Sequence, residues 1–141
     1  MLITQEEYDN LSPITKELHD YLLKWKPKKY NELAKENKLL PYLLDEGKKL
    51  DKLVEDQLDY LGIAGAKQLA REEIYEDLPE GTDDDPDGTA AHETALHEMW
   101  EIFRTEMAEL RQRILAEKKE KRNAQRRKRY AERRQKNTGD I

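Results

Sequence analysis

An acidic stretch near the middle of the chain has oxygen-bearing side chains at alternate positions. In "DDDPDGTAAHET", residues 83–94, positions 1, 3, 5 and 6 of an EF-hand-like loop are filled by Asp83, Asp85, Asp87 and Gly88. Such oxygens suit calcium, yet position 12, where a bidentate Glu belongs, is Thr94. The alternative is an acidic linker that ends in a helix cap, with Asp87 or Thr89 accepting backbone N–H bonds. We favour the linker and keep the three Asp as calcium candidates.

A second group of metal-ligating residue types follows in "HETALHE", residues 92–98. The zincin helix motif needs two His four residues apart, whereas His92 and His97 are five apart. Five residues rotate a helix by about 500°, which turns the second imidazole roughly 140° away from the first. Glu93 does share a face with His97, but one His and one Glu do not complete a zinc site. We expect an exposed helix turn here.

A strongly basic run near the C-terminus is the main candidate for binding chemistry. "KKEKRNAQRRKRYAERRQKN", residues 118–137 and called the basic segment below, holds eleven Lys and Arg against two Glu. Helix formers fill it and no Gly or Pro occurs before Gly139, so we expect one long helix. Cations spaced along a helix can meet successive phosphates, and Arg can also hold a phosphate in a bidentate fork or stack on a base. The candidate nucleic-acid-binding residues are Arg122, Arg126, Arg127, Arg129, Tyr130, Arg133 and Arg134.

Helical spacing organises these residues. Four Arg fall at i, i+4, i+7 and i+11, which is one continuous helix face: Arg122, Arg126, Arg129 and Arg133. Arg127 and Arg134 flank that face, and Tyr130 offers a ring for stacking. The partner expected from this chemistry is RNA or DNA. The alternative is a solvated or protein-docking charged tail.

The local string "NAQRRKRYAERRQKN", residues 123–137, resembles the arginine-rich motifs of lambdoid phage antitermination N proteins. That resemblance implies binding of a hairpin RNA as a bent helix. It covers about fifteen residues and is low in complexity. It also lies at the C-terminal end of this chain, whereas those proteins carry the motif near their start.

Charge is distributed in blocks along the chain. The formal net charge is −5, yet between Arg71 and Arg104 there is no Lys or Arg and there are twelve Asp and Glu. An acidic middle and a basic end indicate a partner of opposite sign, self-association, or mutual shielding of the two blocks at low salt.

Composition limits the remaining function classes. The chain has 141 residues, 36% of them apolar and 40% charged, which suits one small domain with a thin core. There is no Cys, and we found no membrane-spanning apolar run, leader-like start, Ser-His-Asp order, phosphate loop or dinucleotide motif. We therefore expect a cytoplasmic protein without a cofactor that is not an enzyme.

Apolar spacing predicts an all-α fold without a sheet. We expect a small helical bundle over residues 1–77, an acidic linker over 78–89, a core-packing or coiled-coil helix over 90–117, and a basic helical tail over 118–141. Within the bundle, Ser12 and Pro13 start the first helix, whose apolar residues recur at 3.6-residue spacing and so form one face. A short helix stops before Pro41, and Gly47 weakens a third helix that Gly62 ends.

Apolar residues after the linker recur at steps of 4, 3, 4, 3 and 4, the pattern of a coiled-coil seam. This apolar stripe consists of Leu96, Trp100, Phe103, Met107, Leu110 and Ile114. We expect it to be buried on the N-terminal helices of the same chain. The alternative is a homodimer, or a protein partner, that packs on the stripe.

A broader resemblance covers residues 20–80. "YLLKWKPKKYNELAKENKLLPYLLDEGKKL" and "AREEIYEDLP" are similar to small all-helical proteins of the TnpV type, which transposons and phages encode. That resemblance implies a mobile-element origin and no defined activity. The resulting hypothesis is a non-enzymatic nucleic-acid-binding accessory protein, and the alternative is a structural or adaptor protein that acts through helix–helix contacts.

Overall fold

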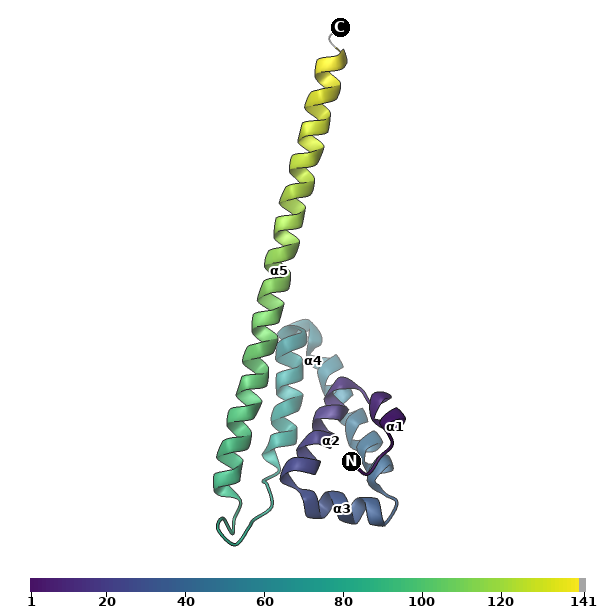
Figure 1. Ribbon diagram of the computed structural model, residues 1–141, viewed down its shortest axis with the longest axis vertical. Coiled ribbons are helices and arrows are strands. Elements are labelled where there is room, and N and C mark those ends of the chain that lie inside the picture. The colour runs from purple at the N-terminus through teal and green to yellow at the C-terminus, as the bar shows by residue number, and fades with distance from the viewer. Residues whose placement is uncertain (140–141) are drawn as a thin grey trace. The chain divides into compact units, whose positions relative to one another are not determined.

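A computed structural model describes residues 1–139, with side chains to Lys136. Within these residues there are five helices and no strand, which confirms the all-α prediction (Figure 1). The helices are Gln5–Asp9 (α1), Pro13–Trp25 (α2), Pro27–Lys35 (α3), Leu39–Glu76 (α4) and Thr89–Gly139 (α5). The chain divides into a first unit, Met1–Phe103, and a second unit, Arg104–Ile141, and each is described by itself below. No helix in the described part of the chain is both long and apolar enough to cross a membrane.

The first two helices start at side-chain caps. Thr4 and Glu7 form a capping box at α1, a helix that the sequence pattern did not predict. At α2 the Ser12 hydroxyl accepts the Thr15 N–H at 3.3 Å and Pro13 occupies the first turn, as predicted. The predicted apolar face of α2 is buried against α3 and α4.

The boundary between the second and third predicted helices was wrong. The short helix ends at Lys35, the chain turns through Asn37 with φ 58°, and α4 begins at Leu39. Pro41 therefore lies in the first turn of α4, where a missing N–H leaves no helical hydrogen bond unmade. Pro41 is compatible with the start of a helix here and does not mark an end.

Two glycines in α4 have different roles. Gly62 has φ 71° and ψ 174°, which breaks the helix into two halves and confirms the predicted stop. The helix continues through Gly47, which is buried at a position where a Cβ would collide with Thr15 Oγ1 of α2. The missing side chain at Gly47 lets α2 approach α4 closely.

The connection after α4 is tied to the first unit. Glu80 N–H donates to the Trp25 carbonyl at 3.0 Å. The Glu80 carboxylate accepts the N–H groups of Lys28 and Lys29 at 3.0 and 2.9 Å, so it caps α3, whose own preceding residue provides no side-chain cap. The predicted acidic linker thus contains a structural anchor for the helix bundle.

The expectation that the apolar stripe is buried was wrong: three of its members, Leu96, Phe103 and Leu110, are half-buried and the other three are exposed. Trp100, Met107 and Ile114 are 42%, 43% and 44% exposed. The α5 residues buried in the core of the first unit are Ala95 and Met99, and Leu96 of the stripe is packed against that core while only partly buried. Ala95 and Met99 precede stripe positions by one residue, so the buried face of α5 is rotated by about 100° from the stripe. A small Ala at the contact lets the helix approach closely, which periodicity alone does not reveal.

Candidate nucleic-acid interface

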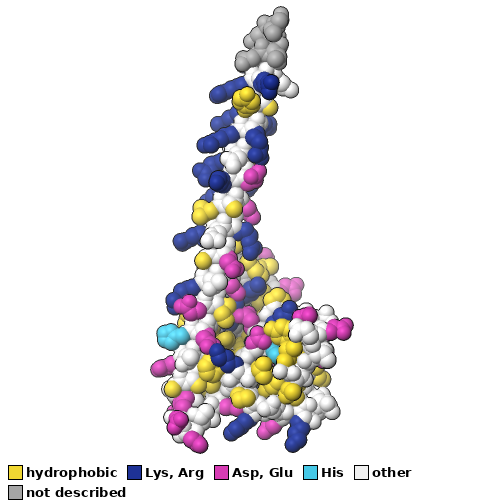
Figure 2. Space-filling view, viewed as in Figure 1, with side chains coloured by type: hydrophobic (Ala, Val, Ile, Leu, Met, Phe, Trp, Pro, Cys, Tyr) yellow, Lys and Arg dark blue, Asp and Glu magenta, His cyan; other side chains and the backbone are white. Residues whose placement is uncertain are grey.

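The basic segment is helical and exposed. It lies in the second unit, where α5 continues without a break to Gly139. From Arg111 to Lys136 every side chain is exposed except that of Asn123, which is half-buried. Figure 2 shows dark blue Lys and Arg side chains following one another along this part of α5. The prediction of a continuous helix is confirmed.

All seven candidate binding residues lie on this one helix, and all are exposed. At about 100° per residue, the four Arg at i, i+4, i+7 and i+11 fall within an arc of roughly 60°. Arg127 and Arg134 are seven residues apart and share a direction roughly 80–100° beyond the edge of that arc. Tyr130 is exposed as well, so its ring is accessible for stacking.

Contacts within the segment leave most of its charge accessible. Arg127 Nη2 and Glu120 Oε1 form an ion pair at 2.8 Å, and both side chains are more than two-thirds exposed. Such a pair contributes ~0–1 kcal/mol and competes poorly with a phosphate that takes a bidentate fork. Nearby, an open hollow is lined by Lys118, Lys121, Arg122 and Gln125. Its rim presents three cations and an amide to an anion.

The two units carry opposite charge. The first has 12 Lys and Arg against 25 Asp and Glu, a formal charge of −13. The second has 14 against 6, a formal charge of +8. A polyanion is therefore attracted to the second unit and repelled by the first, with a range of about 8–10 Å at physiological salt.

The three calcium candidates do different things in the structure. Asp85 accepts the N–H groups of Ala90 and Ala91 at 3.3 and 3.0 Å, and so caps α5. Asp87 accepts the Thr89 N–H at 3.1 Å, and hydrogen bonds from Thr89 hold the pKa of the Asp87 carboxyl below its ordinary value. Asp83 is exposed. The described residues contain no group of three or more ligands that could hold a metal ion.

The His-containing turn lies at the start of α5. Glu93 and His97 are exposed and His92 is half-buried. These three side chains do not form a ligand cluster among the residues that the structure describes.

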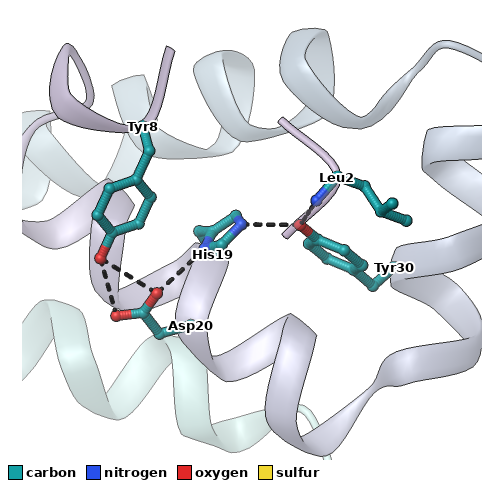
Figure 3. A network of polar contacts seen from close by, with 5 residues as sticks. All are labelled: Leu2, Tyr8, His19, Asp20 and Tyr30. Carbon is teal, nitrogen blue, oxygen red and sulfur yellow. Dashed lines mark hydrogen bonds and ion pairs between the residues drawn. The ribbon is translucent and has the colours of Figure 1, made fainter. Parts of the chain in front are cut away.

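A polar network that the sequence did not predict lies between α1, α2 and α3 (Figure 3). His19 is buried, with Nδ1 3.0 Å from Asp20 Oδ1 and Nε2 2.9 Å from the Tyr30 hydroxyl. Tyr30 also accepts the Leu2 N–H at 2.8 Å, and Tyr8 donates to Asp20. Every partner is satisfied when Nδ1–H donates to Asp20 and Nε2 accepts from Tyr30.

Carboxylate, imidazole and hydroxyl stand in this network in the order of a hydrolase triad. The hydroxyl, however, belongs to Tyr30, which is fully buried and already bonded on its oxygen. No substrate can reach that atom, so the network's role is to fasten the N-terminal residues to α2 and α3. A single His beside an apolar Leu18 gave no sequence signal of this arrangement.

A second unpredicted cluster is charged. Arg71 on α4 is fully buried, and its Nε and Nη2 donate to the Glu17 carboxylate of α2 at 2.6 and 3.1 Å. Its Nη1 donates to Gln68 Oε1 at 2.7 Å. The fork geometry satisfies a charge that would otherwise be costly to bury. This cluster joins two helices and exposes no reactive group.

Comparisons of the chain with protein-family models, with curated proteins and with solved structures find no match to any of them. The two resemblances quoted above therefore rest on their own residues alone.

Proposed function

We propose that this chain is a non-enzymatic nucleic-acid-binding accessory protein that contacts the phosphates of RNA or DNA through the basic segment. The observation that supports this most is the presence of eleven Lys and Arg on one exposed, uninterrupted helix with two Glu. Cations held this way repel one another, and a phosphate backbone relieves that repulsion while releasing condensed counterions. Arg126, Arg127, Arg129, Arg133 and Arg134 carry most of the contact.

The test is a binding titration of the intact chain with a short hairpin RNA and with a short duplex DNA over a series of salt concentrations. We expect the binding constant to fall steeply as salt rises. In a plot of the logarithm of the binding constant against the logarithm of the salt concentration, each neutralised phosphate should add ~0.7–0.9 to the steepness of the slope. Replacing the five Arg by Ala should abolish binding, or lower that slope by about 3 to 5. Ala preserves helix propensity, so circular dichroism should stay unchanged.

A matched control removes the same charge from the first unit. Five exposed Lys on α3 and α4 and in the turn between them serve for this purpose: Lys28, Lys35, Lys38, Lys48 and Lys52. Their replacement by Ala should leave binding intact. Failure of the intact chain to retard either nucleic acid at low salt would falsify the proposal.

Exchanging the five Arg for Lys separates two modes of contact. Point charges preserve the sequence-independent attraction but lose bidentate and stacking contacts. If the Lys variant binds all sequences as the parent does, the interface is purely electrostatic. If it loses preference for one hairpin, the Arg forks or planes read that RNA.

The second candidate function is that of an adaptor that acts through helix–helix contacts. The exposure of Trp100, Met107 and Ile114, each seven residues from the next, favours it, since this is one edge of a coiled-coil seam. The partner is then a second copy or another protein's helix. Replacing Trp100 and Met107 by Ser should abolish a dimer that equilibrium sedimentation detects, and should leave a monomer's melting temperature nearly unchanged.

A further inference from the structure

The point where α4 breaks in two carries a cluster of exposed apolar side chains. Four large residues within six positions are exposed on either side of Gly62: Leu58, Tyr60, Leu61 and Ile63. Tyr60 is 85% exposed, the most of any large hydrophobic residue in the described chain. Clustered exposure of this kind is typical of an interaction surface.

The same surface is acidic. Residues 55–63, called the α4 corner below, include three exposed carboxylates and no Lys or Arg: Glu55, Asp56 and Asp59. The α4 corner therefore has a formal charge of −3 around an apolar centre. A partner must bring apolar side chains flanked by cations, which excludes a nucleic acid and an anionic lipid surface.

The chain itself contains a surface with that chemistry. Residues 111–119 of α5, called the α5 collar below, hold four cations and one Glu, a formal charge of +3. Its apolar members, Ile114 and Leu115, are 44% and 57% exposed. The charge of the collar is thus equal in size and opposite in sign to that of the corner. Both surfaces also have exposed apolar residues between their charged ones.

We propose that the α4 corner of one chain binds the α5 collar of a second copy. Each chain has one corner and one collar, so two reciprocal contacts can close a two-fold symmetric dimer. Apolar contact between Tyr60 or Leu61 and Ile114 supplies adhesion, and the flanking charges set orientation and exclude like-charged partners. This inference does not depend on nucleic-acid binding.

The experiment measures the mass of the full-length chain by equilibrium sedimentation at low and high salt. We expect a dimer at low salt that dissociates as salt rises. The variant Asp56→Lys/Asp59→Lys should be monomeric, and so should Arg111→Glu/Lys118→Glu. All four positions are exposed, so circular dichroism and the melting temperature should stay close to those of the parent.

Charge exchange provides the decisive arm. An equimolar mixture of the two variants should form a heterodimer, because one of its contacts joins the changed corner to the changed collar with exchanged charges and the other joins an unchanged collar to an unchanged corner. A chain carrying all four changes should dimerise for the same reason, since its corner and its collar have exchanged charge. The control Glu32→Lys/Glu76→Lys makes the same charge change on exposed positions of α3 and α4 and should leave the dimer intact.

Three results would overturn the inference: a monomer at every concentration, a dimer that neither pair of changes affects, or a four-change chain that stays monomeric. The corner variant also separates this inference from the proposed function. It keeps the whole basic segment, so it should still retard RNA or DNA even though it no longer dimerises.

Discussion

A carboxylate takes its role from the N–H groups within its reach, as the loop before α5 illustrates. Asp83, Asp85 and Asp87 have the same side chain at alternate positions, yet Asp85 alone accepts from two backbone N–H groups of α5. Those N–H groups lack helical partners, and the helix dipole favours a negative charge beside them. The alternation that suggested calcium therefore contains one helix cap.

Replacing Asp85 by Ala should lower the free energy of unfolding by about 1 kcal/mol, the usual value of such a cap. Asp83→Ala is the matched control and should change stability by less than about 0.5 kcal/mol, because an exposed side chain away from such a feature contributes little. Urea denaturation measures both. A melting temperature that rises with calcium in the parent but not in Asp83→Ala would restore the calcium hypothesis.

Arg71 presents the opposite case, a charge buried among helices. Its guanidinium donates two hydrogen bonds to the Glu17 carboxylate and one to the Gln68 side-chain oxygen. All three guanidinium nitrogens therefore have an acceptor. Losing either member of such a pair leaves the other desolvated without compensation.

Arg71→Met should therefore cost about 3 kcal/mol of stability. The double variant Arg71→Met/Glu17→Leu should recover part of that loss, because no isolated charge remains. Arg71→Lys should fall between the parent and Arg71→Met, since an ammonium cannot form the planar fork. Chemical denaturation of all three variants provides the comparison. Equal stability of Arg71→Met and the parent would show that the pair contributes nothing.

Among the helices, α4 contains a residue of low helix propensity, Gly47, in its interior. Gly47 lowers helix propensity by about 1 kcal/mol relative to Ala, which is why the sequence predicted a weak point there. In the structure this position is buried beside Thr15 of α2. The local cost is offset by the close approach of two helices.

Gly47→Ala should consequently destabilise the chain by about 1 to 2 kcal/mol, because overpacking exceeds the gain in propensity. Asn31→Ala is the control, since Asn31 is exposed within α3 and should be neutral or slightly stabilising. Combining Gly47→Ala with Thr15→Ala should cost less than the sum of the single changes. A Gly47→Ala chain that melts higher than the parent would rule out the contact.

The elements that could be predicted from the sequence are those whose signals are local. Ser12 with Pro13, the 3.6-residue spacing on α2 and the break at Gly62 depend on neighbours in the chain, and all are found. The burial of the apolar stripe was a tertiary expectation, and it was wrong because Ala95 lets an adjacent face of α5 pack inward. Periodicity gives a helix its apolar face but does not say which face a neighbour will cover.

The same division holds for the candidate site. Helicity and exposure of the basic segment followed from composition, because helix formers without an apolar face have nothing to bury. The His19 and Arg71 networks could not be predicted from composition. Each of them joins side chains from different helices, and those residues form no pattern within their own stretch of sequence. Nothing local marks a polar residue whose partner lies on another helix.

At the scale of the whole molecule, the dominant feature is the division of charge into −13 and +8 between the two units. The basic segment of one chain can meet two kinds of anion, a phosphate backbone or the carboxylates of another chain. Both proposals use cations of α5, and Lys118 and Lys119 belong to the α5 collar and to the basic segment alike. The two proposals together therefore predict that nucleic acid and a second copy compete for the same helix.

This competition predicts that a short RNA dissociates the dimer. The α4 corner offers three carboxylates, whereas an RNA offers a phosphate at every nucleotide and releases counterions on binding, so RNA should win at low salt. Sedimentation followed at the absorbance of the RNA should show a complex of one chain with one RNA. The free protein dimer should disappear as RNA is added. The five-Arg Ala variant is the control: its changes lie beyond the collar, so it should remain a dimer that RNA does not affect. A complex of two chains with one RNA would show instead that dimer and nucleic acid are bound together, and that the collar is not shared.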